Sequence, residues 1–160
     1  MNSESAKCIK VGICGFGTVG CGSYNLLLAN GEEITRRVGC AIDIVRIASR
    51  SISSGDFNSA VNISNDPFDV VNDPEVDIVI ETIGGFDPAF EVVLQALVNG
   101  KHVVTANKAL IAERGNELFT VAQENAVTLA YESSVAGGIP IIKALREGLS
   151  ANKIDWLAGI

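Results

Sequence analysis

The residues best suited to binding chemistry form a glycine-rich stretch near the start of the sequence, Gly15-Phe16-Gly17-Thr18-Val19-Gly20. It follows a β-rich apolar run and opens a helical pattern, the context in which a GxGxxG motif binds a dinucleotide. Gly15 would allow the tight turn, Gly17 would let the backbone approach a pyrophosphate, and Gly20 would let helix and strand pack closely. The helix start would offer unpaired N–H groups to the phosphates. The alternative is a glycine-rich turn without a ligand.

The end of the second apolar run indicates which dinucleotide is preferred. In NAD-preferring domains the second strand ends in Asp or Glu, which binds the ribose 2′-hydroxyl. Here the run ends Ile47-Ala48-Ser49-Arg50, without a carboxylate. A hydroxyl and a guanidinium suit a 2′-phosphate, because Arg pairs with phosphate through two parallel hydrogen bonds. Ser49 and Arg50 therefore favour NADP(H), with NAD(H) possible. The alternative for Arg50 is a solvated surface arginine.

Apolar runs alternating with helical stretches must position these residues. The predicted strands are Ile9–Cys14, Ile42–Ala48, Val76–Ile83, His102–Thr105, Val127–Tyr131 and the start of another over Ile154–Ile160. The predicted helices are Val19–Arg37, with a break near Gly31, then Gly115–Asn125 and Pro140–Leu149.

Two Asp-Pro pairs each indicate a further helix, with Asp as the N-cap and Pro in the first helical position. They are Asp66-Pro67, before a short helix, and Asp87-Pro88, before a helix that reaches Asn99 and is stopped by Gly100. The stretch Arg50–Ser64 is rich in Ser, Asn and Gly and is predicted to be mostly loop.

Near-continuous apolar strands separated by helices indicate a parallel sheet covered on both faces. Right-handed crossovers then give an α/β fold with a doubly wound, mostly parallel sheet, a Rossmann-like NAD(P)-binding domain. A chain of 160 residues suits one such domain, and its 48% hydrophobic and 19% charged residues are typical of a folded protein.

Composition excludes several other classes of function. The formal net charge of -7 disfavours binding to nucleic acid. No apolar run reaches the roughly 18 residues that span a bilayer, and residues 1–10 lack the apolar core of a signal peptide, so we expect a cytoplasmic protein. The four cysteines, at 8, 14, 21 and 40, form no CxxC pair and lie far from His102, so small buried thiols are more plausible than a zinc site.

Three later segments, together with the glycine turn, carry a family resemblance. They are Asp77-Ile78-Val79-Ile80-Glu81-Thr82-Ile83-Gly84-Gly85, Lys101-His102-Val103-Val104-Thr105-Ala106-Asn107-Lys108-Ala109-Leu110 and Glu132-Ser133-Ser134-Val135-Ala136-Gly137-Gly138-Ile139-Pro140-Ile141-Ile142. In order and spacing they closely resemble homoserine dehydrogenases, from about residue 11 to residue 160. The resemblance implies interconversion of L-homoserine and L-aspartate 4-semialdehyde with NAD(P), in the biosynthesis of threonine, methionine and isoleucine.

The resemblance implies roles for two strand ends. Thr105-Ala106-Asn107-Lys108 would lie beside the nicotinamide, with Thr105 and Asn107 holding the ribose or carboxamide. Lys108 would approach the substrate and polarise an oxygen or move a proton; its alternative is an ordinary exposed lysine. Ile83, Gly84 and Gly85 would let the cofactor lie close to the backbone, although a glycine pair after a strand is also simply a turn.

The third segment resembles the family's monovalent-cation loop. By position, the ligands to a sodium ion would be Glu132 and the backbone carbonyls of Val135, Gly137 and Ile139. Hard cations prefer oxygen ligands. The alternative is a flexible loop that caps the last helix.

Residues 1–160 are expected to form a single NAD(P)-binding domain, with about 132–160 leading into a substrate and dimerisation region that is missing. Because the sequence ends within an apparent strand, we expect a shortened form of a longer protein, and the family resemblance implies that this longer protein is a homodimer. An Asn-Gly-Thr-Thr-Asn stretch and further acidic and lysine residues would follow in the family. We therefore expect the chain alone to bind cofactor but to oxidise homoserine poorly or not at all.

Two other interpretations remain. Aspartate-semialdehyde dehydrogenase would need a nucleophilic cysteine, but all four cysteines lie in the first 40 residues. A non-catalytic NAD(P)-sensing Rossmann module is a different class of function. The Thr105–Lys108 and Glu132–Pro140 segments argue against it, because a sensor needs no lysine on the substrate side.

Overall fold

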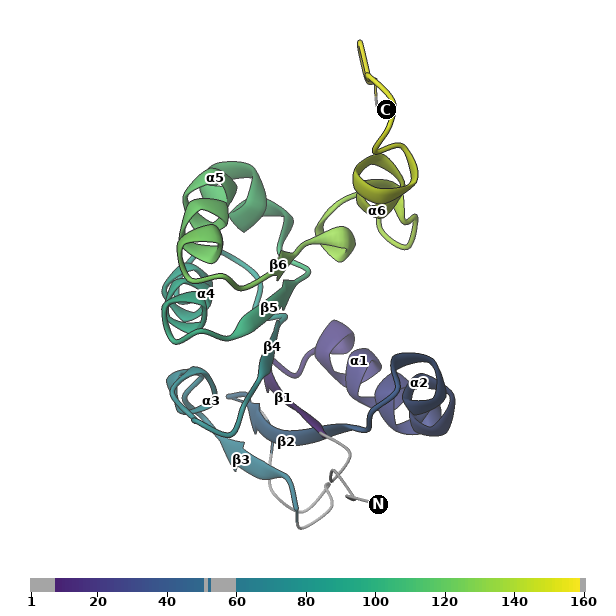
Figure 1. The fold of residues 1–160 in the computed structure, drawn as a ribbon. Helices are drawn as coiled ribbons and strands as arrows, with labels where there is room; N and C mark the ends of the chain where they lie inside the picture. Colours follow the sequence, from purple (N-terminus) through teal and green to yellow (C-terminus); the bar gives the residue numbers. More distant parts are fainter. Residues whose placement is uncertain (1–7, 51, 53–59, 159–160) are drawn as a thin grey trace.

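A computed structural model describes residues 8–50, 52 and 60–158. Six parallel strands form one sheet in the order β3-β2-β1-β4-β5-β6. The strands are β1 (Ile9–Cys14), β2 (Ile42–Ala48), β3 (Asn62–Ser64), β4 (Ile78–Glu81), β5 (His102–Thr105) and β6 (Leu129–Ala130). Figure 1 shows the sheet running through the middle of the molecule, with helices on both sides.

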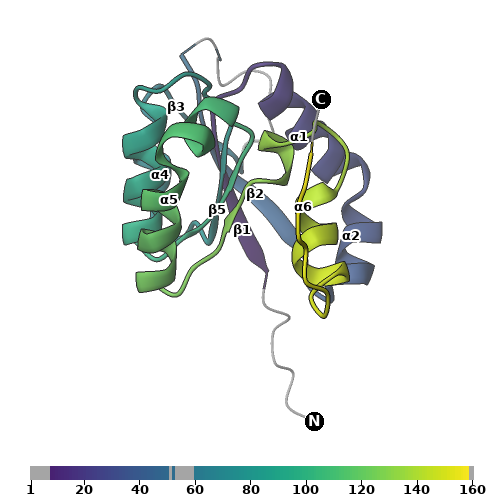
Figure 2. The ribbon, with the colours of Figure 1, turned by 90° about the horizontal axis from the view of Figure 1, so that it is seen from above.

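The helices divide into two layers. On one face lie α1 (Thr18–Ala29) and α2 (Gly31–Val38); on the other lie α3 (Phe68–Val71), α4 (Ala89–Val98) and α5 (Lys108–Glu124) (Figures 1 and 2). After β6 the chain forms the 3₁₀ turn η2 (Glu132–Ser134), the short helix α6 (Ile141–Lys143) and the π-helical turn η3 (Ala144–Gly148). The doubly wound parallel α/β fold predicted from the sequence is confirmed.

The strands distribute their apolar side chains to both faces, as a parallel sheet requires. In β4, Val79 is buried in the cluster beneath α3, α4 and α5, whereas Ile78 and Ile80 pack with Ile13 on the α1 face. The α1 layer covers its face less completely. Two of its leucines, Leu26 and Leu28, are 58% and 61% exposed.

Several predicted elements are confirmed at their boundaries. The strands β1, β2 and β5 begin and end where the apolar runs do. The predicted break near Gly31 separates α1 from α2, and Gly100, with φ of 73°, follows the end of α4. At the two Asp-Pro pairs the helices begin one residue later than predicted, at Phe68 and Ala89, so that Pro67 and Pro88 are the N-cap residues. The Asp66 side chain still accepts a hydrogen bond from the Phe68 amide at 2.9 Å.

Other predictions were wrong. The helix predicted over Gly115–Asn125 begins at Lys108, because the Asn107 side chain caps it by accepting from the Leu110 amide at 3.2 Å. The strands predicted over Val76–Ile83 and Val127–Tyr131 pair only over four and two residues. The helix predicted over Pro140–Leu149 is divided between α6 and η3.

The two remaining differences concern strand pairing. Part of the loop predicted over Arg50–Ser64 is the strand β3, which pairs with β2 through Ile47 and Ile63; residues 51 and 53–59 lie outside the described residues. The strand predicted over Ile154–Ile160 is absent from residues 154–158, while residues 159 and 160 are not described. Trp156 there is 81% exposed, and an apolar run becomes a strand only where a neighbouring strand completes its hydrogen bonds.

No helix among the described residues is long and apolar enough to span a membrane.

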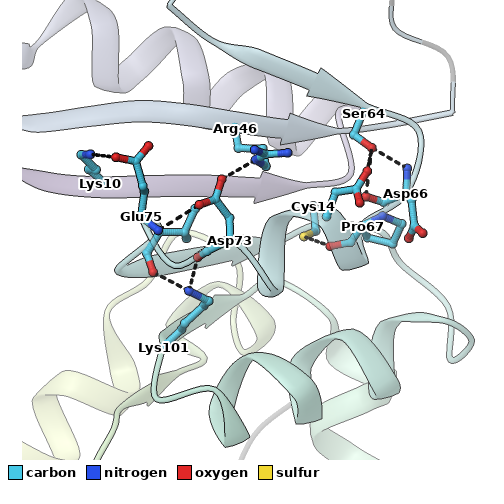
Figure 3. A network of polar contacts seen from close by, with 11 residues as sticks. Lys10, Cys14, Arg46, Ser64, Asp66, Pro67, Asp73, Glu75 and Lys101 are labelled. Carbon is cyan, nitrogen blue, oxygen red and sulfur yellow. Dashed lines mark hydrogen bonds and ion pairs between the residues drawn. The ribbon is translucent and has the colours of Figure 1, made fainter.

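Polar contacts fix the amino-terminal edge of β4 (Figure 3). The Lys101 ammonium donates to the carbonyl oxygens of Asp73 and Val76 at 2.5 and 2.7 Å, and Arg46 donates to the Asp73 carboxylate at 2.6 Å. Burial lowers the pKa of Lys101, partly offset by the carboxylates of Asp73 and Asp77. These contacts hold the segment that leads into β4.

The Cys14 thiol gives the fold a predictable weakness at alkaline pH. Burial, with a smaller contribution from the charge of Glu81, raises the pKa of Cys14 far above its ordinary value of 9.0. Above pH 9 the unfolded chain loses this proton while the folded chain keeps it, so stability falls as pH rises. Between pH 8 and 10 we expect Cys14 to account for about 1.4 kcal/mol of the loss. Urea unfolding of the Cys14→Ala variant should show a correspondingly smaller loss; equal losses would contradict the prediction.

Candidate functional site

The candidate site is a cleft at the carboxyl ends of β1 and β4. The chain leaves β1 toward α1 on one face and β4 toward α4 on the other, so the strand order reverses between these two strands (Figure 1). Ligands of open α/β sheets bind at such a reversal. The cleft has a volume of about 390 Å³. It is lined by residues of four segments: Gly15, Phe16, Gly17, Ala48, Ser49, Arg50, Asn65, Pro67, Thr82, Ile83, Gly84, Asp87 and Pro88.

The three glycines of the GxGxxG turn are required for different physical reasons. Gly15 has φ of 92°, and a Cβ atom there would lie 2.6 Å from the backbone of Thr82. At Gly20 a Cβ atom would lie 2.2 Å from the carbonyl oxygen of Gly15. A Cβ atom at Gly17, by contrast, would have no other atom within 4 Å, so that glycine faces open space. Two glycines are therefore fixed by packing, and the third leaves room for a ligand.

The start of α1 offers hydrogen-bond donors to that space. Gly17 is the N-cap residue of α1, and no side chain caps the helix. The first turn of a helix leaves its N–H groups without intrahelical partners. Gly17, Thr18 and Val19 are exposed, and the first turn carries no acidic residue that would repel an anion. These features suit a phosphate group.

The end of β2 places Ser49 and Arg50 in the same cleft. The Ser49 amide donates to the Ser64 carbonyl at 2.9 Å, which holds the strand end against β3. Arg50 is exposed, and no carboxylate among the described residues forms a salt bridge with it. Its guanidinium is thus available to an anionic group in the cleft. Asp87 contributes the one carboxylate of the lining described above.

Glu81 is a functional candidate that the sequence analysis missed. It ends β4 and is completely buried. One carboxylate oxygen accepts from the amides of Ile83 and Gly84 at 2.8 and 3.4 Å, and the other accepts from the Thr105 hydroxyl at 2.5 Å. A lone carboxylate at the end of an apolar strand, three residues before a glycine pair, is the sequence signal that could have identified it.

The segment after β5 lies beside this carboxylate rather than in the cleft. The Thr105 hydroxyl accepts from the Asn107 amide at 3.0 Å, and the Asn107 side chain donates to the Gly85 carbonyl at 2.6 Å. Ala106 donates its amide to the Glu81 carbonyl at 3.2 Å. Thr105 and Asn107 are buried, so their side chains serve the turn and the α5 cap. Lys108, at the first position of α5, is exposed.

The predicted cation positions lie in one loop between β6 and α6. Glu132 caps α6, because its two carboxylate oxygens accept from the amides of Ile142 and Lys143 at 2.9 Å each. The Ile139 carbonyl accepts from the Ile141 amide at 2.8 Å. Val135 and Gly137 lie between them, with Gly137 at φ of 61°. Within the described residues, no three His, Cys, Asp or Glu side chains are grouped so that they could hold a metal ion.

A sequence model described as the NAD-binding domain of homoserine dehydrogenase matches residues 15–132. The chain belongs to the homoserine dehydrogenase family. The match includes all four segments that line the cleft, and it also includes the Thr105–Lys108 segment beside Glu81.

Individual homoserine dehydrogenases agree with this assignment. The chain is 58% identical over 154 residues to a homoserine dehydrogenase of Pseudomonas aeruginosa, covering 96% of the chain and 36% of that protein. It is 40% identical over 157 residues to one of Bacillus subtilis, again covering 96% and 36%. The chain therefore spans about a third of the length of these curated relatives.

Solved structures of homoserine dehydrogenases have the same fold. One from Thiobacillus denitrificans superposes with a TM-score of 0.85 at 56% identity, covering 91% of the chain and 34% of that protein. Another, from a hyperthermophilic archaeon in complex with NADPH, superposes with a TM-score of 0.74 at 28% identity, covering 91% and 50%.

Proposed function

We propose that the chain is the cofactor-binding part of an NAD(P)-dependent homoserine dehydrogenase that interconverts L-homoserine and L-aspartate 4-semialdehyde. The observation that carries the proposal is the cleft at the β1–β4 reversal, where Gly17 faces open space beside the uncapped start of α1. The relatives named above share the whole region that builds this cleft. Such an enzyme would act in the cytoplasm on amino-acid biosynthesis from aspartate.

The described residues fit a nicotinamide dinucleotide. The pyrophosphate would accept hydrogen bonds from the amides of Gly17, Thr18 and Val19, and Gly17 has no side chain to obstruct it. The adenosine ribose would lie against Ser49 and Arg50. The bound nicotinamide supplies the chemistry of hydride transfer.

NADP(H) is the preferred cofactor in this proposal, and NAD(H) is a weaker ligand. The guanidinium of Arg50 would pair with the 2′-phosphate, and the hydroxyl of Ser49 would donate to it. No carboxylate ends β2 to select the free ribose hydroxyl. One homoserine dehydrogenase of this fold is described in complex with NADPH.

Lys108 would face the substrate at the nicotinamide end of the site. Its exposed position at the start of α5 leaves the ammonium free to donate to a substrate oxygen. Because the side chains of Thr105 and Asn107 are engaged with Glu81 and Gly85, those two residues would shape the ribose and carboxamide site mainly through the backbone.

A sodium ion and a second protomer complete the proposal. The ion would be bound by Glu132 and by the carbonyls of Val135, Gly137 and Ile139, since a carboxylate that accepts two N–H bonds keeps further lone pairs. A homodimer would cover apolar surface such as Trp156 and Leu157, which are 81% and 64% exposed.

A fluorescence titration with NADPH and NADH tests the cofactor proposal. Replacing Arg50 by Ala should weaken NADPH binding about tenfold to a hundredfold, the contribution expected of one charged hydrogen-bonding group, and should change NADH binding little. Arg37→Ala is the matched control, because it removes the same charge from α2, where Arg37 pairs with Glu33 outside the cleft. Equal losses of affinity for NADPH and NADH would show that Arg50 does not recognise the 2′-phosphate. Failure of the unaltered chain to bind either would contradict the function itself.

A further inference from the structure

A buried carboxylate connects the turn after β4, which lines the cleft, to the end of β5. Glu81 is the only acidic side chain that is buried among the described residues. Burying a carboxylate is unfavourable unless hydrogen bonds replace its lost hydration. Here three donors do so: the amides of Ile83 and Gly84 and the hydroxyl of Thr105. The first two belong to the turn that lines the cleft, and the third belongs to the end of β5.

These contacts close into a ring through Asn107. The Glu81 carboxylate accepts from the Thr105 hydroxyl, and the hydroxyl oxygen accepts from the backbone N–H of Asn107. The side-chain NH₂ group of Asn107 donates to the carbonyl of Gly85. Gly85 is one residue beyond the Gly84 amide that points back to Glu81. These hydrogen bonds therefore join the turn after β4 to the start of α5. Ser134 adds an outer contact by donating to the Thr105 carbonyl at 2.8 Å.

The carboxylate of Glu81 fixes the direction of the Thr105 hydroxyl bond, the one bond of the ring whose donor is not an N–H group. A hydroxyl has one proton, which Thr105 gives to the carboxylate, so its oxygen is free to accept from Asn107. Glutamine cannot replace this arrangement. If its amide oxygen faced the amides of Ile83 and Gly84, its NH₂ group would face Thr105 and the hydroxyl proton would lose its acceptor.

We propose that Glu81 is a positioning residue that couples the turn at 83–85 to the segment at 105–108, and so sets the spacing between the cleft and the nicotinamide end of the cofactor site. The inference rests on the proposed cofactor-binding function. Glu81 is absent from the cleft lining, so it acts through the two backbone segments rather than by touching the ligand.

If Glu81 acts through Thr105, substitutions of the two residues should have non-additive effects on NADPH affinity. In NADPH titrations, Glu81→Gln and Thr105→Val should each weaken binding about tenfold, because each breaks a charge-assisted hydrogen bond of the ring. The double variant should bind about as well as the weaker single variant, since the ring is already open. Combining Glu81→Gln with Ser49→Ala, outside the ring, should instead multiply the two losses.

Controls separate positioning from a general loss of structure. Thr105→Ser keeps the hydroxyl and should bind NADPH within about twofold of the unaltered chain, even if Thr105→Val binds weakly or Glu81→Gln fails to fold. Urea unfolding of each variant gives its folded fraction. Losses that multiply in the Glu81–Thr105 double variant, or unchanged affinity in a folded Glu81→Gln variant, would overturn the inference. If the unaltered chain bound no dinucleotide, the proposed function would fail instead.

Discussion

Gly17→Ala is expected to weaken NADPH binding by about a hundredfold or more while the protein remains folded. The added methyl group meets no protein atom within 4 Å, so it occupies space on the ligand side of the turn. There it would keep the pyrophosphate from the amides at the start of α1. Loss of two charge-assisted hydrogen bonds, at roughly 1.5 kcal/mol or more each, corresponds to about a hundredfold in affinity.

The expected cost to the fold of this substitution is small. Gly17 has φ of -76°, which alanine adopts freely, and alanine is less favourable than glycine at an N-cap by only about 1 kcal/mol. The measurement pairs an NADPH titration with urea unfolding. Gly22→Ala is the matched control, because it adds the same methyl group within α1, also with no atom within 4 Å. Near-normal NADPH affinity in a folded Gly17→Ala variant would show that no phosphate approaches this turn.

Gly20→Ala should act on the fold instead, and it should lower the free energy of unfolding by about 3 kcal/mol or more. Its methyl group would lie 2.2 Å from the Gly15 carbonyl oxygen and 2.8 Å from the Thr82 hydroxyl oxygen. The first of these atoms is backbone in a turn that is itself held against β4, since the Thr82 hydroxyl donates to the Gly15 carbonyl at 2.8 Å. Adding a methyl group at a tightly packed site typically costs about 1–3 kcal/mol of stability, and it costs more where neither the helix nor the turn can move away.

Urea unfolding without cofactor measures this second effect directly. In the Gly22→Ala control, alanine should stabilise α1 by up to about 1 kcal/mol, because glycine is a poor helix former. The contrast between positions 20 and 22 therefore removes helix propensity as an explanation. A Gly20→Ala variant as stable as the unaltered chain would mean that α1 can move away from β1 at little cost.

Local sequence determined much of the sheet and the glycine turn. The strands β1, β2 and β5 are short, largely apolar runs, and a parallel sheet buries such runs on both faces. The spacing of Gly15, Gly17 and Gly20 predicted separate roles for them, and the space around each supports those roles. By contrast, the β3 strand Asn62–Ser64 is polar at both ends, and it forms only because β2 offers it an unpaired edge.

Features that depend on long-range pairing could not be predicted. Glu81 faces Thr105 because β4 and β5 pair in a register that aligns these two residues, and nothing in either segment alone specifies that register. The early start of α5 depends on the Asn107 cap, which the sequence analysis treated only as part of a ligand-binding motif. The apolar run after Lys153 has strand-like composition but no strand to pair with among the described residues.

The strand order has a consequence for how the protein folds. Most neighbouring strands pair residues that are close in sequence, such as Ile78 with His102, but the β1–β4 pairing joins Val11 to Ile78. Closing that longer loop costs more chain entropy, so the two halves of the sheet can form before they join. The cleft lies where these two halves of the sheet meet, so it is completed only when they join. A refolding experiment followed by NADPH fluorescence should therefore report the final docking of the halves, later than signals from helix formation.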